Sequence, residues 1–158
     1  MKVRTLLAIA LLFASSFSSP SAVLAAETCV GNPEAGAVRL EVKTVGLRND
    51  NGLVAVTLYP DNKKRFLAPK GKLFRQRVHA ALPVTKVCFL IPPGSYAVAV
   101  YHDENENRDF DRNAVGLPAE GFGFSQNPAT QFGLPKLHEA RFTVPEDGST
   151  ITVQMRYR

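Results

Sequence analysis

Hydrophobic and polar residues alternate with a period of two along much of the chain. In the segment 38–43, valine and leucine occupy every second position, and arginine, glutamate and lysine lie between them. Comparable apolar spacing recurs in the segments 54–58, 78–82, 87–91, 96–100, 142–144 and 151–157. Because successive side chains of a strand point to opposite faces, this spacing predicts about seven short β-strands. Without a helical period between them, we expect an all-β protein, a single antiparallel β-sandwich.

Turn-forming residues separate these segments. Asn51-Gly52 lies between the first two, and this dipeptide favours the positive φ angles of a tight hairpin turn. We therefore expect the segments 38–43 and 54–58 to pair as an antiparallel hairpin. Pro92-Pro93-Gly94 and Pro145-Glu146-Asp147-Gly148 mark two later turns.

The N-terminus has the parts of a secretory signal peptide. Lys2 and Arg4 form a short positive region, residues 6–14 are apolar, and Val23-Leu24-Ala25 resembles a cleavage site. The apolar run is too short for a membrane-spanning helix, so cleavage near Ala25 is expected to release a periplasmic or secreted protein without a transmembrane segment. The expected divisions are a signal peptide (1–25), an N-terminal segment (26–36) and a β-sandwich domain (37–158).

Charge and cysteine content extend this picture. The formal net charge is +5, and loss of Lys2 and Arg4 with the signal peptide lowers it by two, to +3. That excess is small for a nucleic-acid-binding protein, so no nucleic-acid partner is expected. An oxidising compartment favours a disulfide between Cys29 and Cys88, which would tie the N-terminal segment to a strand. The alternative is two unpaired thiols, with Cys88 buried.

One long segment, residues 102–137, lacks the alternation. Turn residues, carboxylates and glycines dominate it, and a loop of this length is usually either functional or disordered. Disordered segments are poor in aromatic residues, whereas this one contains Phe110, Phe122, Phe124 and Phe132. We therefore expect one long ordered loop that folds back over the sandwich, with Phe122 and Phe124 as candidates to face a ligand.

The start of this loop has the spacing of a calcium-binding loop. Oxygen-bearing side chains stand at alternate positions, as in an EF-hand: Asp103, Asn105, Asn107, Asp109 and Asp111. Carboxylates that lie close together repel unless a cation lies among them, and Ca²⁺ prefers carboxylate and amide oxygens. Arg108 and Ala114 replace the usual glycine and acid of the sixth and twelfth positions, and Glu120 is a candidate for the missing acid. The alternative is a solvated acidic turn.

Other chemistry has less support. The motifs of serine hydrolases, zinc proteases and phosphate-binding loops are absent from the sequence. His102, beside the acidic loop, is a candidate ligand-facing side chain, and the alternative is a hydrogen-bonded structural imidazole. The segment 63–77 is basic and contains no acid, which suits either an anionic surface or the solvated edge of a sheet.

Several motifs follow one another in a specific order. They are Gly46–Gly52, Pro93–Val98, the His-Asp-Glu-Asn sequence from His102, and Gly116–Ser125. Together they resemble a bacterial family catalogued as domain of unknown function 2141, over the chain from about Val38 to its end. The resemblance implies an exported single-domain protein without an assigned activity. Family members usually have glycine where this chain has Glu106 and Arg108, so the turn is expected to be strained. The Pro-Gly-Ser-Tyr turn also resembles prealbumin-like and carboxypeptidase-regulatory-like sandwiches.

These observations favour a non-enzymatic, exported binding or accessory protein with an acidic loop ordered by Ca²⁺. Its expected partner is an envelope protein or a small ligand. One alternative is a small hydrolase on a prealbumin-like scaffold, although the C-terminal Met155–Arg158 lacks the Tyr-Arg-Gly-Ser tail of hydroxyisourate hydrolases. Another alternative is a purely structural envelope protein.

Overall fold

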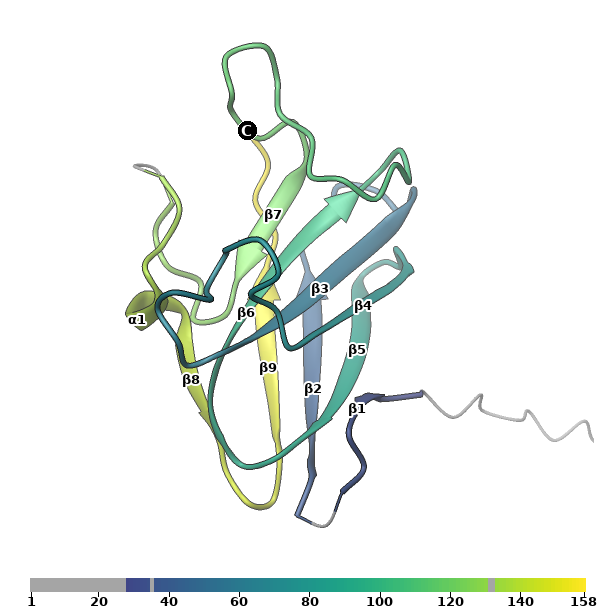
Figure 1. Cartoon of the computed structure of the whole chain (residues 1–158). Helices are drawn as coiled ribbons and strands as arrows, with labels where there is room; N and C mark the ends of the chain where they lie inside the picture. The colour runs from purple at the N-terminus through teal and green to yellow at the C-terminus, as the bar shows by residue number, and fades with distance from the viewer. Residues whose placement is uncertain (1–27, 35, 131–132) are drawn as a thin grey trace, which may run out of the picture.

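The computed structural model describes residues 28–34, 36–130 and 133–158. In these residues two β-sheets pack against each other around a shared hydrophobic core (Figure 1). The all-β sandwich is therefore confirmed. The predicted signal peptide (1–25) and Phe132 lie outside the described residues. In the described part, no helix is long and apolar enough to cross a membrane.

The strands divide into two sheets. Sheet A contains, in spatial order, β1 (Val30–Gly31), β5 (Val84–Ile91), β2 (Val38–Val45) and β9 (Ser149–Gln154). Sheet B contains β4 (Phe74–His79), β3 (Leu53–Pro60), β6 (Gly94–Asp103) and β7 (Gly121–Phe124) in spatial order, and β8 (Arg141–Val144) pairs with the first half of β6. The described residues thus form nine strands rather than about seven, together with one short helix, α1 (Leu137–Ala140).

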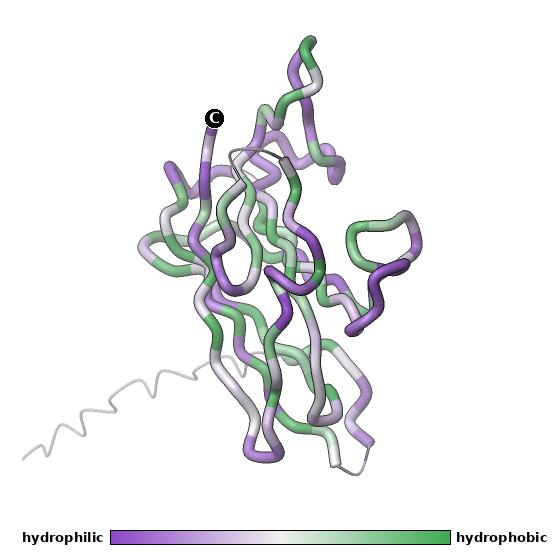
Figure 2. The backbone as a smooth tube through the Cα atoms, turned by 90° about the vertical axis from the view of Figure 1, so that its left-hand side faces the viewer, coloured by the Kyte–Doolittle hydropathy of each residue, from purple (hydrophilic) through white to green (hydrophobic). Residues whose placement is uncertain are grey.

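The period-two alternation explains how the sheets meet. Leu40 and Val42 of β2 are fully buried, whereas the intervening Arg39 and Glu41 lie at or near the surface. The same spacing buries one face of each main strand, and green and pale positions recur along the sandwich in Figure 2. Full burial of a valine or leucine side chain contributes roughly 1.5–3 kcal/mol, so this shared core is the main source of stability.

The predicted first hairpin is wrong, because β2 and β3 lie in different sheets. β2 pairs with β5 and β9, whereas β3 pairs with β4 and β6. Residues 46–52 instead carry the chain from sheet A to sheet B. Gly52 does have a positive φ of 67°, and a Cβ there would collide with the backbone of Asp103 and Glu104. The turn residue was correctly identified, but local sequence does not specify which strands it joins.

Sheet A is mixed rather than antiparallel. β1 runs parallel to β5, and β9 runs parallel to β2. β9 follows β8, which belongs to sheet B, so the chain changes sheets at the turn after Val144. A strand that arrives from the opposite sheet is not constrained to run antiparallel to its neighbour, as it would be in a hairpin.

The segment 102–137 is not a single loop. Its first two residues end β6, and β7 lies within it. The sequence of β7 does not alternate between apolar and polar residues, because a glycine, Gly123, stands between Phe122 and Phe124. A Cβ at Gly123 would contact Val153 and Gln154, so glycine lets β7 approach the end of β9.

The predicted disulfide is confirmed. Cys29 and Cys88 are bonded, with a separation of 59 residues along the chain. Cys88 is fully buried in β5, and Cys29 directly precedes β1. Val30 pairs with Phe89, so the disulfide and the short parallel ladder hold the N-terminal segment against sheet A.

Removing the disulfide should lower the free energy of unfolding by about 4 kcal/mol on the loop-entropy model, because the unfolded chain regains the freedom of a 59-residue loop. The variant is the double substitution Cys29→Ala and Cys88→Ala, and the measurement is urea denaturation with and without reductant. Reductant should destabilise the wild type to the level of the variant and leave the variant unchanged. Equal stability of the oxidised wild type and the variant would contradict this prediction.

Candidate functional site

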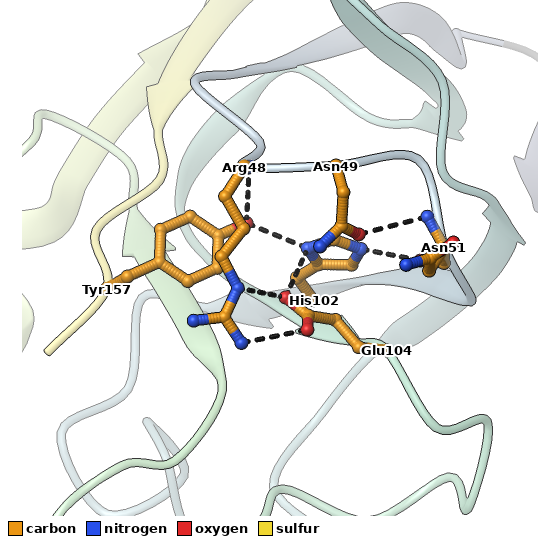
Figure 3. A network of polar contacts seen from close by, with 6 residues as sticks. All are labelled: Arg48, Asn49, Asn51, His102, Glu104 and Tyr157. Atoms are coloured by element: carbon orange, nitrogen blue, oxygen red, sulfur yellow. Dashed lines mark hydrogen bonds and ion pairs between the residues drawn. The ribbon is translucent and has the colours of Figure 1, made fainter.

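His102 belongs to a buried hydrogen-bond network (Figure 3). Its side chain is 0% exposed, Nε2 lies 2.7 Å from the carbonyl oxygen of Asn51, and Nδ1 lies 2.7 Å from the Tyr157 hydroxyl. A carbonyl oxygen only accepts, so Nε2 carries a proton; in the neutral imidazole, Nδ1 then accepts the hydroxyl proton of Tyr157, and it also lies 3.4 Å from Glu104 Oε1. The Tyr157 oxygen in turn accepts the backbone N–H of Arg48 at 3.2 Å. His102 therefore occupies a structural position rather than a ligand-facing one.

An ion pair closes this network on its solvent side. Arg48 Nε and Nη2 lie 2.6 and 2.8 Å from the two carboxylate oxygens of Glu104. This hydrogen-bonded pairing lowers the pKa of Glu104 and raises that of Arg48, while burial raises the pKa of Tyr157. The Arg48 guanidinium also lies 4.7 Å from the centroid of the Tyr157 ring. The network thus joins the 46–52 connection, the end of β6 and the C-terminal segment.

The carboxylates of Asp103 and Glu120 lie close together where β6 ends and β7 begins. The β6–β7 ladder ends with His102 paired to Gly121, and just beyond it burial raises the pKa of Glu120 and the charge of Asp103 is close enough to add to that rise. Their side chains are 0% and 5% exposed. Asp103 Oδ2 accepts the N–H of Arg108 at 2.9 Å, and Glu120 Oε2 accepts the N–H of Asp111 at 3.2 Å.

The other two oxygens of this carboxylate pair lack hydrogen-bond partners. Among the described residues, no donor lies at ordinary hydrogen-bond geometry to Asp103 Oδ1 or Glu120 Oε1, although the backbone N–H of Glu104 acts on the Glu120 carboxylate. Burial raises the pKa of Glu120, the charges of Asp103 and Asp111 add to that rise, and the backbone N–H groups of Asp111 and Glu104 oppose it. A buried carboxylate with an unpaired oxygen beside a second carboxylate is costly, and a bound cation would lower that cost.

The remaining predicted metal ligands form a neighbouring cluster. The side-chain amides of Asn105 and Asn107 donate to the Asp111 carboxylate at 2.7–3.0 Å. Their amide oxygens accept backbone N–H groups, that of Asp109 included. Asp109 itself is exposed. The structure thus separates the predicted ligands into the carboxylate pair and a cluster around Asp111, which the Asp111–Glu120 hydrogen bond joins.

In the described residues, no group of three or more His, Cys, Asp or Glu side chains is arranged to hold a metal ion. The predicted ligands are therefore not gathered into the single EF-hand-like set that their spacing along the sequence suggested. Ca²⁺ also takes amide and carbonyl oxygens as ligands, and the loop offers those of Asn105 and Asn107. The unpartnered oxygens of the carboxylate pair are therefore the more informative feature, because each lacks a hydrogen donor, a proton or a cation.

The acidic loop, residues 104–120 between β6 and β7, contains a turn with backbone strain. Glu106 and Arg108, which replace the usual glycines of the resembled family, have φ angles of 59° and 67°. This left-handed conformation costs roughly 1–2 kcal/mol for a residue with a Cβ. Arg77 Nη2 and the Tyr101 hydroxyl both donate to the Arg108 carbonyl, at 3.1 and 3.0 Å, and so hold the turn against sheet B.

An aromatic pocket of about 220 Å³ lies on the face of sheet B that points away from sheet A. Its lining includes Tyr59, Tyr101, Phe110, Phe122 and Phe124, together with the cations Arg75 and Arg112. The ring of Phe110 lies edge-on to those of Tyr101 and Phe122, at centroid distances of 5.7 and 6.2 Å. Phe122 and Phe124, the two candidates to face a ligand, therefore line this pocket. Phe110 and Arg112 belong to the acidic loop, so this loop forms one wall of the pocket.

Sequence reasoning missed most of this lining. A signal was present in β3 and β6, whose segments 53–59 and 96–101 are almost continuously apolar rather than alternating. Such runs indicate strands that are buried on both faces, and hence an outer face covered by other parts of the chain. Arg75 lies on the edge strand β4, as expected for the basic segment, but its guanidinium points over sheet B, where Nε donates to Thr57 Oγ1 at 2.7 Å.

Residues 42–152 match the model of a family described as an uncharacterized protein conserved in bacteria, domain of unknown function 2141. The chain belongs to this family. No curated protein and no solved structure matches the chain, so the likeness to prealbumin-like sandwiches stays a prediction. The family match begins within β2 and ends within β9. It contains the carboxylate pair and the aromatic pocket, whereas Cys29 and Tyr157 lie outside it.

Replacing Tyr157 with Phe should lower the free energy of unfolding by about 1–3 kcal/mol, because buried Nδ1 of His102 loses its donor. Urea denaturation of the wild type and the Tyr157→Phe variant measures this loss. Tyr96→Phe is the matched control, since the Tyr96 hydroxyl donates to the carbonyl of exposed Pro92, where water can replace it. We expect at most about 1 kcal/mol for the control. Equal losses in both variants would be inconsistent with a special role for Tyr157.

Replacing Arg108 with Gly, the residue that is usual in the family, should raise the free energy of unfolding by about 0.5–1 kcal/mol. The left-handed strain disappears, and part of this gain is offset by the greater freedom of glycine in the unfolded chain. Glu146→Gly is the control, because Glu146 is exposed and is not among the positive-φ residues. The control should lose stability in the same urea titration. A loss for Arg108→Gly as well would show that the turn is not strained.

Proposed function

We propose that this chain is an exported, non-enzymatic binding protein whose pocket on sheet B takes a small ligand. The observation that carries the proposal is the shared wall: Phe110 and Arg112 line the pocket, and both lie in the acidic loop. The N-terminal sequence features support export. The lining supplies aromatic, aliphatic and cationic groups, which are typical of a binding site with a few placed polar contacts.

We further propose that Ca²⁺ orders the acidic loop. Asp103 Oδ1 and Glu120 Oε1 are buried oxygens without a hydrogen donor at ordinary geometry among the described residues, and the two carboxylates lie close together where β6 ends and β7 begins. The carboxylate and amide side chains around Asp111 offer further hard ligands beside them. A cation here would neutralise the repulsion between carboxylates and draw the two clusters together.

The proposed cation site is coupled to the pocket by strand geometry. Tyr101 and Phe122 are paired across β6 and β7, and they stand two residues from Asp103 and Glu120 respectively. A two-residue step along a strand is about 7 Å and returns to the same face of the sheet. The cation and the ligand would therefore occupy neighbouring positions on one surface, and the loop that contacts the cation also carries Phe110.

Addition of 1 mM Ca²⁺ should raise the melting temperature by a few degrees and protect the acidic loop from protease. A dissociation constant of about 10⁻⁴–10⁻³ M, usual for extracellular calcium modules, gives roughly 0.4–1.4 kcal/mol by mass action. Glu120→Gln should abolish this increase. In calcium-free buffer the variant should melt at or above the wild-type temperature, because one of two neighbouring buried carboxylates is gone.

The matched control is Glu106→Gln, in the same loop but with an exposed side chain outside the predicted ligand set. It should retain the full response to Ca²⁺. Chelator should reverse the response of the wild type, and Mg²⁺ should give a smaller one, because it demands a more rigid octahedral site. An unchanged melting temperature and unchanged proteolysis in 10 mM Ca²⁺ would refute cation ordering while leaving ligand binding open to its own test.

A further inference from the structure

One row of paired residues crosses the floor of the aromatic pocket. Arg75 pairs with Thr57, Thr57 pairs with Ala99, and Ala99 pairs with Phe124, on β4, β3, β6 and β7 in turn. Adjacent strands lie about 4.8 Å apart, so the ends of this row are roughly 14 Å apart at the backbone. The two middle residues are small, while Arg75 and Phe124 at the ends are large. The row therefore forms a short trough with a cation at one end and an aromatic ring at the other.

The cation at the end of this trough lacks an acidic partner. Arg75 donates from Nε to Thr57 Oγ1, and its guanidinium carbon lies 5.8 Å from the centroid of the Tyr101 ring. Among the described residues it forms no ion pair, whereas the surface residues Arg48 and Arg141 are paired with Glu104 and Asp61. The guanidinium is half-buried and is also hydrogen-bonded to the Tyr59 hydroxyl, but no carboxylate among the described residues neutralises its charge.

A second cation stands on the loop side of the pocket. The Arg112 guanidinium carbon lies 5.4 Å from the centroid of the Phe110 ring, and Nη1 donates to the Gly116 carbonyl at 3.0 Å. Within the described residues, Arg112 also forms no ion pair with a carboxylate. Two arginines without acidic partners at one aromatic pocket are complementary to an anion, and guanidinium groups bind carboxylate, sulfonate or phosphate oxygens through paired hydrogen bonds.

The size of the pocket limits the rest of the ligand. A cavity of about 150 Å³ holds benzene in other proteins. The volume here, about 220 Å³, therefore suits a compound of one or two rings. Phe122 makes T-shaped contacts with Phe110 and Phe124, and a flat aromatic ligand would extend this arrangement.

We infer that the pocket selects a small aromatic acid, with its anionic group at Arg75 and its ring over Ala99 towards Phe124. This inference rests on the binding function proposed above and specifies the chemistry of the ligand. Arg112, on the loop side of the pocket, would supply a second positive charge to the bound anion. The adjacent carboxylate pair would oppose an anion unless a cation neutralised it, so binding is expected to be strongest when Ca²⁺ is present.

The probes are 2-naphthoate and its neutral analogue 2-naphthalenemethanol, which share one ring system and differ in charge. Isothermal titration in 1 mM Ca²⁺ should show the naphthoate bound at least about tenfold more tightly, since charge-assisted hydrogen bonds are stronger than neutral ones. Arg75→Gln should weaken naphthoate binding about fivefold or more and leave the neutral analogue within about twofold. Ala99→Leu fills the floor of the trough and should weaken both probes.

Lys86→Gln is the matched control, because it removes one exposed positive charge from sheet A and should leave both affinities unchanged. Circular dichroism and thermal melts confirm that each variant is folded. Equal affinity for the two probes, or no effect of Arg75→Gln on naphthoate, would overturn the choice of an anion while leaving the pocket as a binding site, provided that Ala99→Leu still blocks it. Failure of both probes to bind at millimolar concentration would overturn this inference and the proposed binding function together.

Discussion

The structure depends on the burial of both faces of the central strands of sheet B. The inner face of β3 and β6 supplies Val54, Val56 and Val98 to the core shared with sheet A, and that core sets the sandwich. The outer face is also apolar, so it cannot be left in contact with water without cost. Connecting segments that contribute Leu67, Phe110 and Leu134 cover part of it, and they leave an aromatic pocket over the small residues Thr57 and Ala99. The candidate binding site is thus a consequence of how the second face is covered.

The acidic loop is held by contacts that oppose its own conformational preferences. Arg108 adopts a left-handed conformation, yet its N–H is bound by Asp103 and its carbonyl by Arg77 and Tyr101. Asp103 in turn is buried close to Glu120, an arrangement that stores repulsion. Backbone strain and repulsion between like charges lower the stability of this loop, and such features cluster at functional sites. A cation would relieve the charge, and it would do so next to the pocket.

The network around His102 shows how differently a similar set of side chains can be used. Histidine, glutamate and tyrosine beside an acidic loop resemble catalytic groups in composition. Here each is satisfied within the protein: both ring nitrogens of His102 are engaged, and Glu104 is paired with Arg48. The groups at the pocket are the reverse case, because Arg75 and Arg112 have no acid beside them among the described residues. Unmatched charge, rather than the type of residue, distinguishes the candidate site from the structural network.

The sequence by itself determined the fold class, the positions of most strands, the bond between Cys29 and Cys88 and the family, but it missed β1 and β7 and placed β4 at 78–82 rather than at Phe74–His79. The features that it determined follow from local pattern: alternation buries one face of a strand, and two cysteines allow one intramolecular pairing. Tertiary structure alone decided that β2 and β3 belong to different sheets, because the strand spacing is the same for any partner. It also decided that Asp103 lies close to Glu120 and that Arg75 faces Phe124 across a trough. Those relations depend on register between strands that are distant in sequence, and register is set by the packing of the whole sandwich.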